Sequence, residues 1–151
     1  MDMQEKPTGM ALGKTLSEIF KVMKKKAAEQ TEAMLTFDQF GLLYAINQQK
    51  QDVIQKDMAE SMGKDKSVIL RIIDSLEEKE LVRRVVDMND RRKNQILVTK
   101  KGLLTIDQYL EIEFQVKTEL LDGVSQSDVD TFYKVLGHIR TKAEQMNAQN
   151  S

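Results

Sequence analysis

Two short β-prone runs constrain this chain most, because every other apolar pattern in it has helical spacing. Residues 81–86 and 95–99 are rich in Val, Leu and Ile, and Asp87–Asp90 between them has the Asp and Asn residues of turns. We expect a two-stranded hairpin whose tip carries the three consecutive cations Arg91–Lys93. Because an exposed tip contributes little to folding, these cations are expected to face a partner.

A pair of helices is predicted immediately before this hairpin. Residues 55–62 form a short helical pattern, Gly63 suits the left-handed residue that ends a helix, and Asp65 can cap the next helix. The second helix has an apolar stripe of Val68, Ile69, Ile72, Ile73 and Leu76. Two helices joined by a short turn and followed by a hairpin predict a winged helix-turn-helix.

Further helices are expected on both sides. An amphipathic helix should run from about Ala11 towards Glu29, and Thr36 with Gln39 forms a capping box that starts another. A long helix with a wide apolar stripe is expected after Gly102, and a last one from Ser127 or Asp128. Its inward side chains should be Val129, Phe132, Tyr133, Leu136 and Ile139, with a frayed tail over 147–151.

Composition excludes most catalytic chemistry. The 151 residues include no Cys and one His, so neither a thiolate nor a multi-histidine metal site can form. The sequence contains no Gly-rich phosphate loop, no H-E-x-x-H motif and no nucleophile elbow. We therefore expect a non-enzyme with no catalytic residue, metal or cofactor. The nine Met residues are interpreted as core filler, some of which could line an adaptable pocket.

The sequence favours a cytoplasmic protein without a membrane partner. No stretch reaches the roughly 20 apolar residues of a membrane span, and residues 1–13 lack the pattern of a signal peptide.

Charge is distributed unevenly along the chain. Residues 64–102 hold 11 Lys and Arg against 7 Asp and Glu, a net charge of +4 within a chain of −1. Taken alone, this charge imbalance favours a solvated face. However, the basic segment coincides with the predicted winged helix, which is what a binding site for a polyanion would require.

The stretch QKDMAESMGKDKSVILRIIDSLEEKELVRRVVDMNDRRKNQILVTKKG, residues 55–102, resembles the winged helix of the MarR family of bacterial transcription regulators. The wing DMNDRR and the following TKKG are its most specific parts, and TFDQFGLLYAI before it resembles the family's second helix. Departures are Glu80 in place of the usual Gly, Ile54 in place of a capping Thr, and Val68 and Leu70 in place of Thr residues.

The first turns of the helix that follows Asp65 would enter a major groove. Lys66 and Arg71 can donate to guanine or phosphate, and Ser67 can reach either. Leu70 lies off the apolar stripe and is expected to be exposed, whereas Val68 suits the core as well as a thymine methyl. The resemblance implies that Arg92 enters the minor groove and that Asp90 holds it. The DNA-binding set predicted is Lys64, Lys66, Ser67, Val68, Leu70, Arg71, Asp90, Arg91, Arg92 and Lys93.

Wide apolar stripes at both ends of the chain indicate a homodimer, because one protomer cannot cover them. The dimerisation set predicted is Leu12, Leu16, Ile19, Phe20, Phe132, Tyr133, Leu136 and Ile139. The expected fold is mainly α with a small β-hairpin wing, as a single domain over 1–151. In it, about 34–102 form the winged helix-turn-helix, and about 8–30 and 103–146 form the dimerisation helices.

These features predict a homodimeric, sequence-specific regulator that binds a palindromic operator in double-stranded DNA. The resemblance adds a small-molecule effector bound between the dimerisation helices and the winged helix, and repression as the usual behaviour. The alternatives are a winged helix that binds proteins without specific DNA binding, for which Leu70 is the one argument, and a small helical enzyme.

Overall fold

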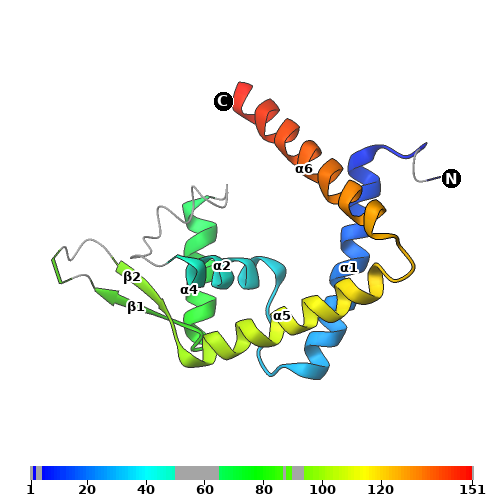
Figure 1. The fold of residues 1–151 in the computed structure, drawn as a ribbon. Helices are drawn as coiled ribbons and strands as arrows, with labels where there is room; N and C mark the ends of the chain where they lie inside the picture. The colour runs from blue at the N-terminus through cyan, green and yellow to red at the C-terminus, as the bar shows by residue number, and fades with distance from the viewer. Residues whose placement is uncertain (1, 3–4, 50–64, 87, 90–93, 151) are drawn as a thin grey trace. The chain divides into compact units, whose positions relative to one another are not determined.

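The structure, a computed structural model, describes residues 2, 5–49, 65–86, 88–89 and 94–150. These residues form helices α1, α2, α4, α5 and α6 and one hairpin (Figure 1). Their bounds are α1 Thr8–Gln30, α2 Phe37–Gln48, α4 Lys66–Glu78, β1 Val82–Val86, β2 Asn94–Val98, α5 Lys100–Leu120 and α6 Gln126–Gln149. The expected class, mainly α with a small hairpin, is confirmed. The predicted 55–62 helix and Gly63 lie outside the described residues.

The chain separates into two compact units, Met1–Phe114 and Gln115–Ser151, each of which is described by itself. The first unit contains α1, α2, α4, the hairpin and most of α5; the second contains the end of α5 and α6.

The start of α2 confirms the predicted capping box. The Thr36 side-chain oxygen accepts from the Gln39 backbone N–H at 3.2 Å, and the Gln39 side-chain oxygen accepts from the Thr36 N–H at 3.0 Å. Two donors at the helix end are thereby satisfied reciprocally. Behind this cap α2 buries Leu42, Leu43 and Ile46.

The hairpin is antiparallel, with Val82 opposite Val98, Arg84 opposite Ile96 and Val86 opposite Asn94. Val82 and Ile96 on one face are buried, while Arg83 and Leu97, paired on the other face, are exposed. The predicted two-stranded hairpin is confirmed, and the face that carries Val82 and Ile96 contributes to the core.

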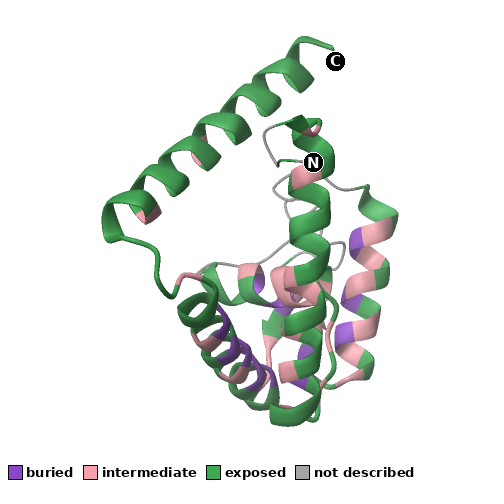
Figure 2. Cartoon of the chain, turned by 90° about the vertical axis from the view of Figure 1, so that its right-hand side faces the viewer, coloured by how far each residue is buried: buried purple, intermediate pink, exposed green. Residues whose placement is uncertain are grey.

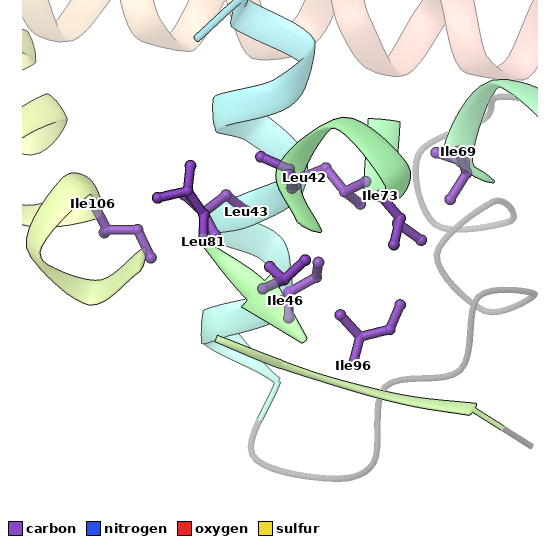
Figure 3. Close-up of a cluster of buried hydrophobic side chains, with 10 residues drawn as sticks. Leu42, Leu43, Ile46, Ile69, Ile73, Leu81, Ile96 and Ile106 are labelled. Atoms are coloured by element: carbon purple, nitrogen blue, oxygen red, sulfur yellow. The ribbon is translucent and has the colours of Figure 1, made fainter. Parts of the chain in front are cut away.

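One apolar cluster joins α2, α4, α5 and the hairpin (Figure 3). Its buried members are Leu42, Leu43, Ile46, Ile69, Ile73, Leu76, Leu81, Val82, Ile96 and Ile106. Because α4 and the hairpin contribute to the same core, the two elements that would reach DNA are held in one packed body.

The junction between the hairpin and α5 depends on Thr99. Its hydroxyl donates to the Glu80 carbonyl oxygen at 2.6 Å and accepts from the Gly102 N–H at 3.0 Å. With its start capped in this way, α5 begins at Lys100, earlier than the sequence pattern indicated. Gly102 is buried inside the first turn.

Glu80 occupies the left-handed region, with φ of 61°. This is the position where the resemblance expects Gly, and the strain explains that preference, since a Cβ there costs about 1–2 kcal/mol. The carboxylate lies 3.9 Å from the Lys101 ammonium, with both side chains exposed, so this pair contributes little.

Glu80→Gly is expected to stabilise the protein by roughly 0.5–1 kcal/mol, because relief of strain exceeds the extra chain entropy of Gly. Urea unfolding followed by circular dichroism measures the difference. Glu80→Ala is the matched control: it removes the carboxylate but keeps the Cβ, and should give no gain. If Glu80→Ala stabilised the protein and Glu80→Gly did not, the carboxylate charge would be the cause. That result would contradict backbone strain as the explanation.

Helix α6 differs from its prediction. Ser125, whose side chain accepts from the Asp128 N–H at 3.1 Å, is the N-cap, so the helix starts before Ser127. It continues to Gln149, where a frayed tail was expected. No α6 residue is buried, and Figure 2 shows the helix almost entirely in the exposed colour. The side chains predicted to face inward are therefore exposed in the single chain, apart from the half-buried Val129.

Helix α5 has two apolar faces, and the chain itself covers only one. Thr105, Ile106, Tyr109, Ile112 and Val116 are buried. The wide stripe expected from the sequence is therefore buried at Ile106, Tyr109, Ile112 and Val116 and half-buried at Leu121. Its other members, Leu103, Leu110, Phe114 and Leu120, are exposed, with Phe114 66% exposed.

Candidate nucleic-acid interface and apolar cavity

The first turns of α4 present the predicted polar contacts to solvent. Lys66, Ser67 and Arg71 are exposed, whereas Val68 and Leu70 are half-buried. The half-burial of Leu70 corrects the expectation of an exposed apolar side chain and weakens the argument for a protein-binding surface. Asp65 occupies the N-cap position, but its side chain makes no cap hydrogen bond, so the predicted cap is wrong in its chemistry.

Ser67 and Arg71 lie one turn apart and therefore share a face of α4. Lys66 and Arg71 are exposed, and neither makes an ion pair with another residue in the part of the chain that the structure describes. Arg83 adds a further exposed cation on β1. The arrangement can donate hydrogen bonds to phosphates and to base edges.

Arg84 joins the hairpin to α4. Its guanidinium donates to the Glu77 carboxylate at 2.8 Å and to the Asp74 carboxylate at 2.6 Å, and its backbone N–H donates to Glu77 at 3.0 Å. Burial alone would lower the pKa of Arg84, but the hydrogen bonds to the two carboxylates raise it above its ordinary value. The guanidinium is therefore a permanent charge in this cluster.

This Arg84 clamp has two structural consequences. It fixes the orientation of β1 on α4. It also compensates Asp74, which lies one turn from Arg71 and would otherwise repel a phosphate there. The sequence predicted Arg84 only as part of a strand. The signal for the clamp was the presence of an Asp and a Glu, three residues apart, on the preceding helix.

The remaining predicted DNA contacts, Lys64 and Asp90–Lys93, lie outside the described residues. Their roles stay predictions from the sequence.

A cavity of about 480 Å³ opens within the first unit between α1, the 31–36 loop, α2 and α5. Its wall is almost entirely apolar and aromatic. It is formed by Leu16, Ile19, Phe20, Met23, Lys24, Ala27, Met34, Leu35, Thr36, Phe37, Phe40, Tyr109 and Glu113. Met23 and Met34 line this cavity, as the sequence allowed for some Met residues. The main interpretation of the Met residues, core filler, is wrong for the described part of the chain, in which no Met is buried.

Aromatic pairs stiffen this wall. The Phe20 and Phe37 ring centroids are 4.8 Å apart, and Phe40 stacks on Tyr109 at 5.1 Å. Lys24 and Glu113, the two charged side chains of the wall, are exposed. The cavity thus suits a largely apolar, flat molecule whose charged or polar part stays near solvent.

Tyr109 is the buried polar group of this wall, 5% exposed. Its hydroxyl accepts from the Leu35 N–H at 2.8 Å and donates to the Ala33 carbonyl oxygen at 3.0 Å. Burial raises the pKa of Tyr109 above its ordinary value, although the Leu35 hydrogen bond lowers it in part. The phenol therefore keeps its proton and can donate to Ala33.

The predicted dimerisation residues fall into two groups. Leu16, Ile19 and Phe20 line the cavity, which the sequence did not indicate. Phe132, Tyr133, Leu136, Ile139 and Leu12 are exposed apolar side chains of the single chain.

Two negative findings concern only the residues that the structure describes. Among them, no group of three or more His, Asp or Glu side chains could hold a metal ion. No helix in the same residues is long and apolar enough to cross a membrane.

Comparison with known proteins agrees with this geometry. Residues 35–93 match the model of the MarR family. A MarR-family transcriptional regulator from Rhodococcus sp. RHA1 shares 24% identity over 87% of this chain and 91% of its own, with a TM-score of 0.72.

Two further structures have the same fold. CouR from Rhodococcus jostii RHA1, bound to p-coumaroyl-CoA, is 24% identical over 92% of this chain and 94% of its own, with a TM-score of 0.72. S. aureus MepR in complex with DNA is 19% identical over 91% of this chain and 99% of its own, with a TM-score of 0.79.

Helix α4 followed by an antiparallel hairpin on a shared core is the recognition half of a winged helix. The resemblance to the MarR family is confirmed by the match over residues 35–93 and by the fold shared with solved MarR-type regulators. Members of this family are transcription regulators and not enzymes.

Proposed function

We propose that this chain is a cytoplasmic, sequence-specific transcription regulator that binds double-stranded DNA as a homodimer. The observation that carries the proposal is the exposed Lys66, Ser67 and Arg71 at the start of α4, on a helix that the Arg84 clamp fixes to the hairpin. MepR, which has the same fold, has been solved with DNA. Repression at a palindromic operator is the mode of action proposed.

The dimer brings together the apolar faces that the single chain leaves in water. Phe132, Leu136 and Ile139 on α6 are exposed, and no α6 residue is buried. A two-fold axis would present two α4 helices to half-sites about one helical turn apart on DNA.

The cavity is the site proposed for a small-molecule effector. Its volume of about 480 Å³ and its aromatic wall suit a drug-sized apolar ligand. CouR, which shares the fold, has been solved with p-coumaroyl-CoA. No cofactor is needed in this mechanism, because binding energy alone shifts the equilibrium.

Arg71→Ala and Lys66→Ala should each weaken DNA binding without unfolding the protein, because both side chains are exposed. A lost base contact should cost roughly 1–3 kcal/mol and relax one operator position, whereas a lost phosphate contact should reduce the salt slope by about one. Fluorescence anisotropy against salt concentration separates these cases.

Lys25→Ala on α1 is the matched control, since it removes an equally exposed cation from a helix outside the winged helix. It should leave both affinity and salt slope unchanged. Full retention of affinity and specificity in the Lys66/Arg71 double variant would contradict the proposal and favour the alternative, a winged helix that binds proteins.

A further inference from the structure

The cavity and the recognition helix are connected by a short series of hydrogen bonds within the first unit. The series begins at Tyr109 on α5, whose hydroxyl holds the backbone of the 33–35 loop at both Ala33 and Leu35. This loop is part of the cavity wall. A molecule that pushes on the wall therefore acts on a segment with two fixed attachment points.

The loop ends at Thr36, which lines the cavity and is also the N-cap of α2. Thr36 is bonded in both directions to Gln39, through the capping box at 3.0 and 3.2 Å. The amide orientation of Gln39 is set by this box, because the Thr36 N–H can only donate and so faces the amide oxygen.

That orientation leaves the Gln39 amide nitrogen directed at α4. It donates to the Ser75 hydroxyl at 2.9 Å. Ser75 lies on α4 between Asp74 and Glu77, the two carboxylates that hold Arg84 and with it the hairpin. The terminal amide of Gln39 thus contacts the cavity-lining Thr36 through its oxygen and the clamped part of the recognition helix through its nitrogen.

We infer that Gln39 is a positioning residue that couples occupancy of the cavity to the placement of α4 on DNA. The inference rests on the proposed function, because it requires both an effector in the cavity and α4 on DNA. A ligand that displaces the 33–36 backbone would alter the capping box, and the Gln39–Ser75 bond would transmit this displacement to α4.

The coupling can be tested without knowing the ligand, by a double-mutant cycle with DNA affinity as the readout. Tyr109→Phe releases the loop from its anchor at the cavity, and Ser75→Ala removes the contact of Gln39 with α4. Each variant is measured by anisotropy on one duplex, selected by the wild-type protein from a random library, and its folding is checked by thermal melting.

With Ser75 present, Tyr109→Phe should change the dissociation constant by about three- to tenfold, the range of one net hydrogen bond. In the Ser75→Ala background, the same substitution should change it by less than about twofold, because the connection is already broken. Ser75→Thr retains the hydroxyl and should restore the larger effect, which a merely structural role for Ser75 would not require.

If the Tyr109→Phe protein does not fold, Thr36→Val replaces it in the double-mutant cycle. This substitution breaks the capping box while nearly conserving the side-chain volume. Equal fold-changes in the wild-type and Ser75→Ala backgrounds would overturn the coupling and leave the proposed function intact. Failure of every protein, wild type included, to prefer any duplex would overturn both.

Discussion

Gly102→Ala is expected to destabilise the protein by about 3 kcal/mol or more, although helix propensity alone predicts a gain of roughly 1 kcal/mol. A Cβ at Gly102 would lie 2.7 Å from the Val98 Cγ1 atom and closer still to the Leu81 carbonyl oxygen. Leu81 is fully buried, and its carbonyl accepts from the Thr99 N–H at 3.0 Å, so this backbone cannot move away cheaply.

Gly13→Ala in α1 is the matched control, because a Cβ there meets nothing within 4 Å. It should stabilise the protein by up to about 1 kcal/mol, in line with helix propensity. Chemical unfolding of both variants checks the opposite signs. A Gly102→Ala variant as stable as Gly13→Ala would mean that α5 does not approach Leu81 as closely as described.

Phe132→Asp is expected to separate the dimer. Phe132 is 51% exposed in the single chain, and a two-fold interface contains it twice. Loss of two such burials costs roughly 3–6 kcal/mol, or about 10²–10⁴-fold in the dimer dissociation constant. Operator affinity should fall with it, although α4 and the hairpin are unchanged, because the two half-site readers are no longer joined.

Gln145→Asp controls for the added charge, because Gln145 is exposed on the opposite side of α6. It should leave both assembly and DNA binding intact. Sedimentation at low micromolar protein is the direct measurement. A Phe132→Asp protein that stays dimeric would remove α6 from the interface, and a wild-type monomer that binds an inverted repeat tightly would contradict the dimer.

The sequence correctly predicted the structural elements that depend on residues close together in the chain. The Thr36–Gln39 capping box formed as expected because its partners are three residues apart. The hairpin formed because β-prone runs flank turn residues, and its register places Val82 and Ile96 on the core. The prediction of α6 was wrong at its start because several residues there can cap a helix, and the turn containing Gly123, with φ of 80°, selects Ser125.

Features that depend on tertiary packing could not be predicted in this way. The Arg84 clamp joins residues that are neighbours only after the hairpin folds back on α4. Helix α5 carries apolar residues on two faces, and periodicity alone does not say which face the same chain covers. For the same reason the sequence does not indicate that Leu16, Ile19 and Phe20, which are predicted dimerisation residues, line the cavity.

Selection of bound sites from random duplexes with the wild-type protein tests whether a two-fold dimer binds DNA sequence-specifically. We expect enrichment of an inverted repeat whose half-site centres lie about 10 base pairs apart. Affinity for the enriched duplex should exceed that for scrambled DNA by at least about 10³-fold at physiological salt. If no motif were enriched and every duplex bound with the same salt-dependent affinity, sequence-specific DNA binding would be contradicted.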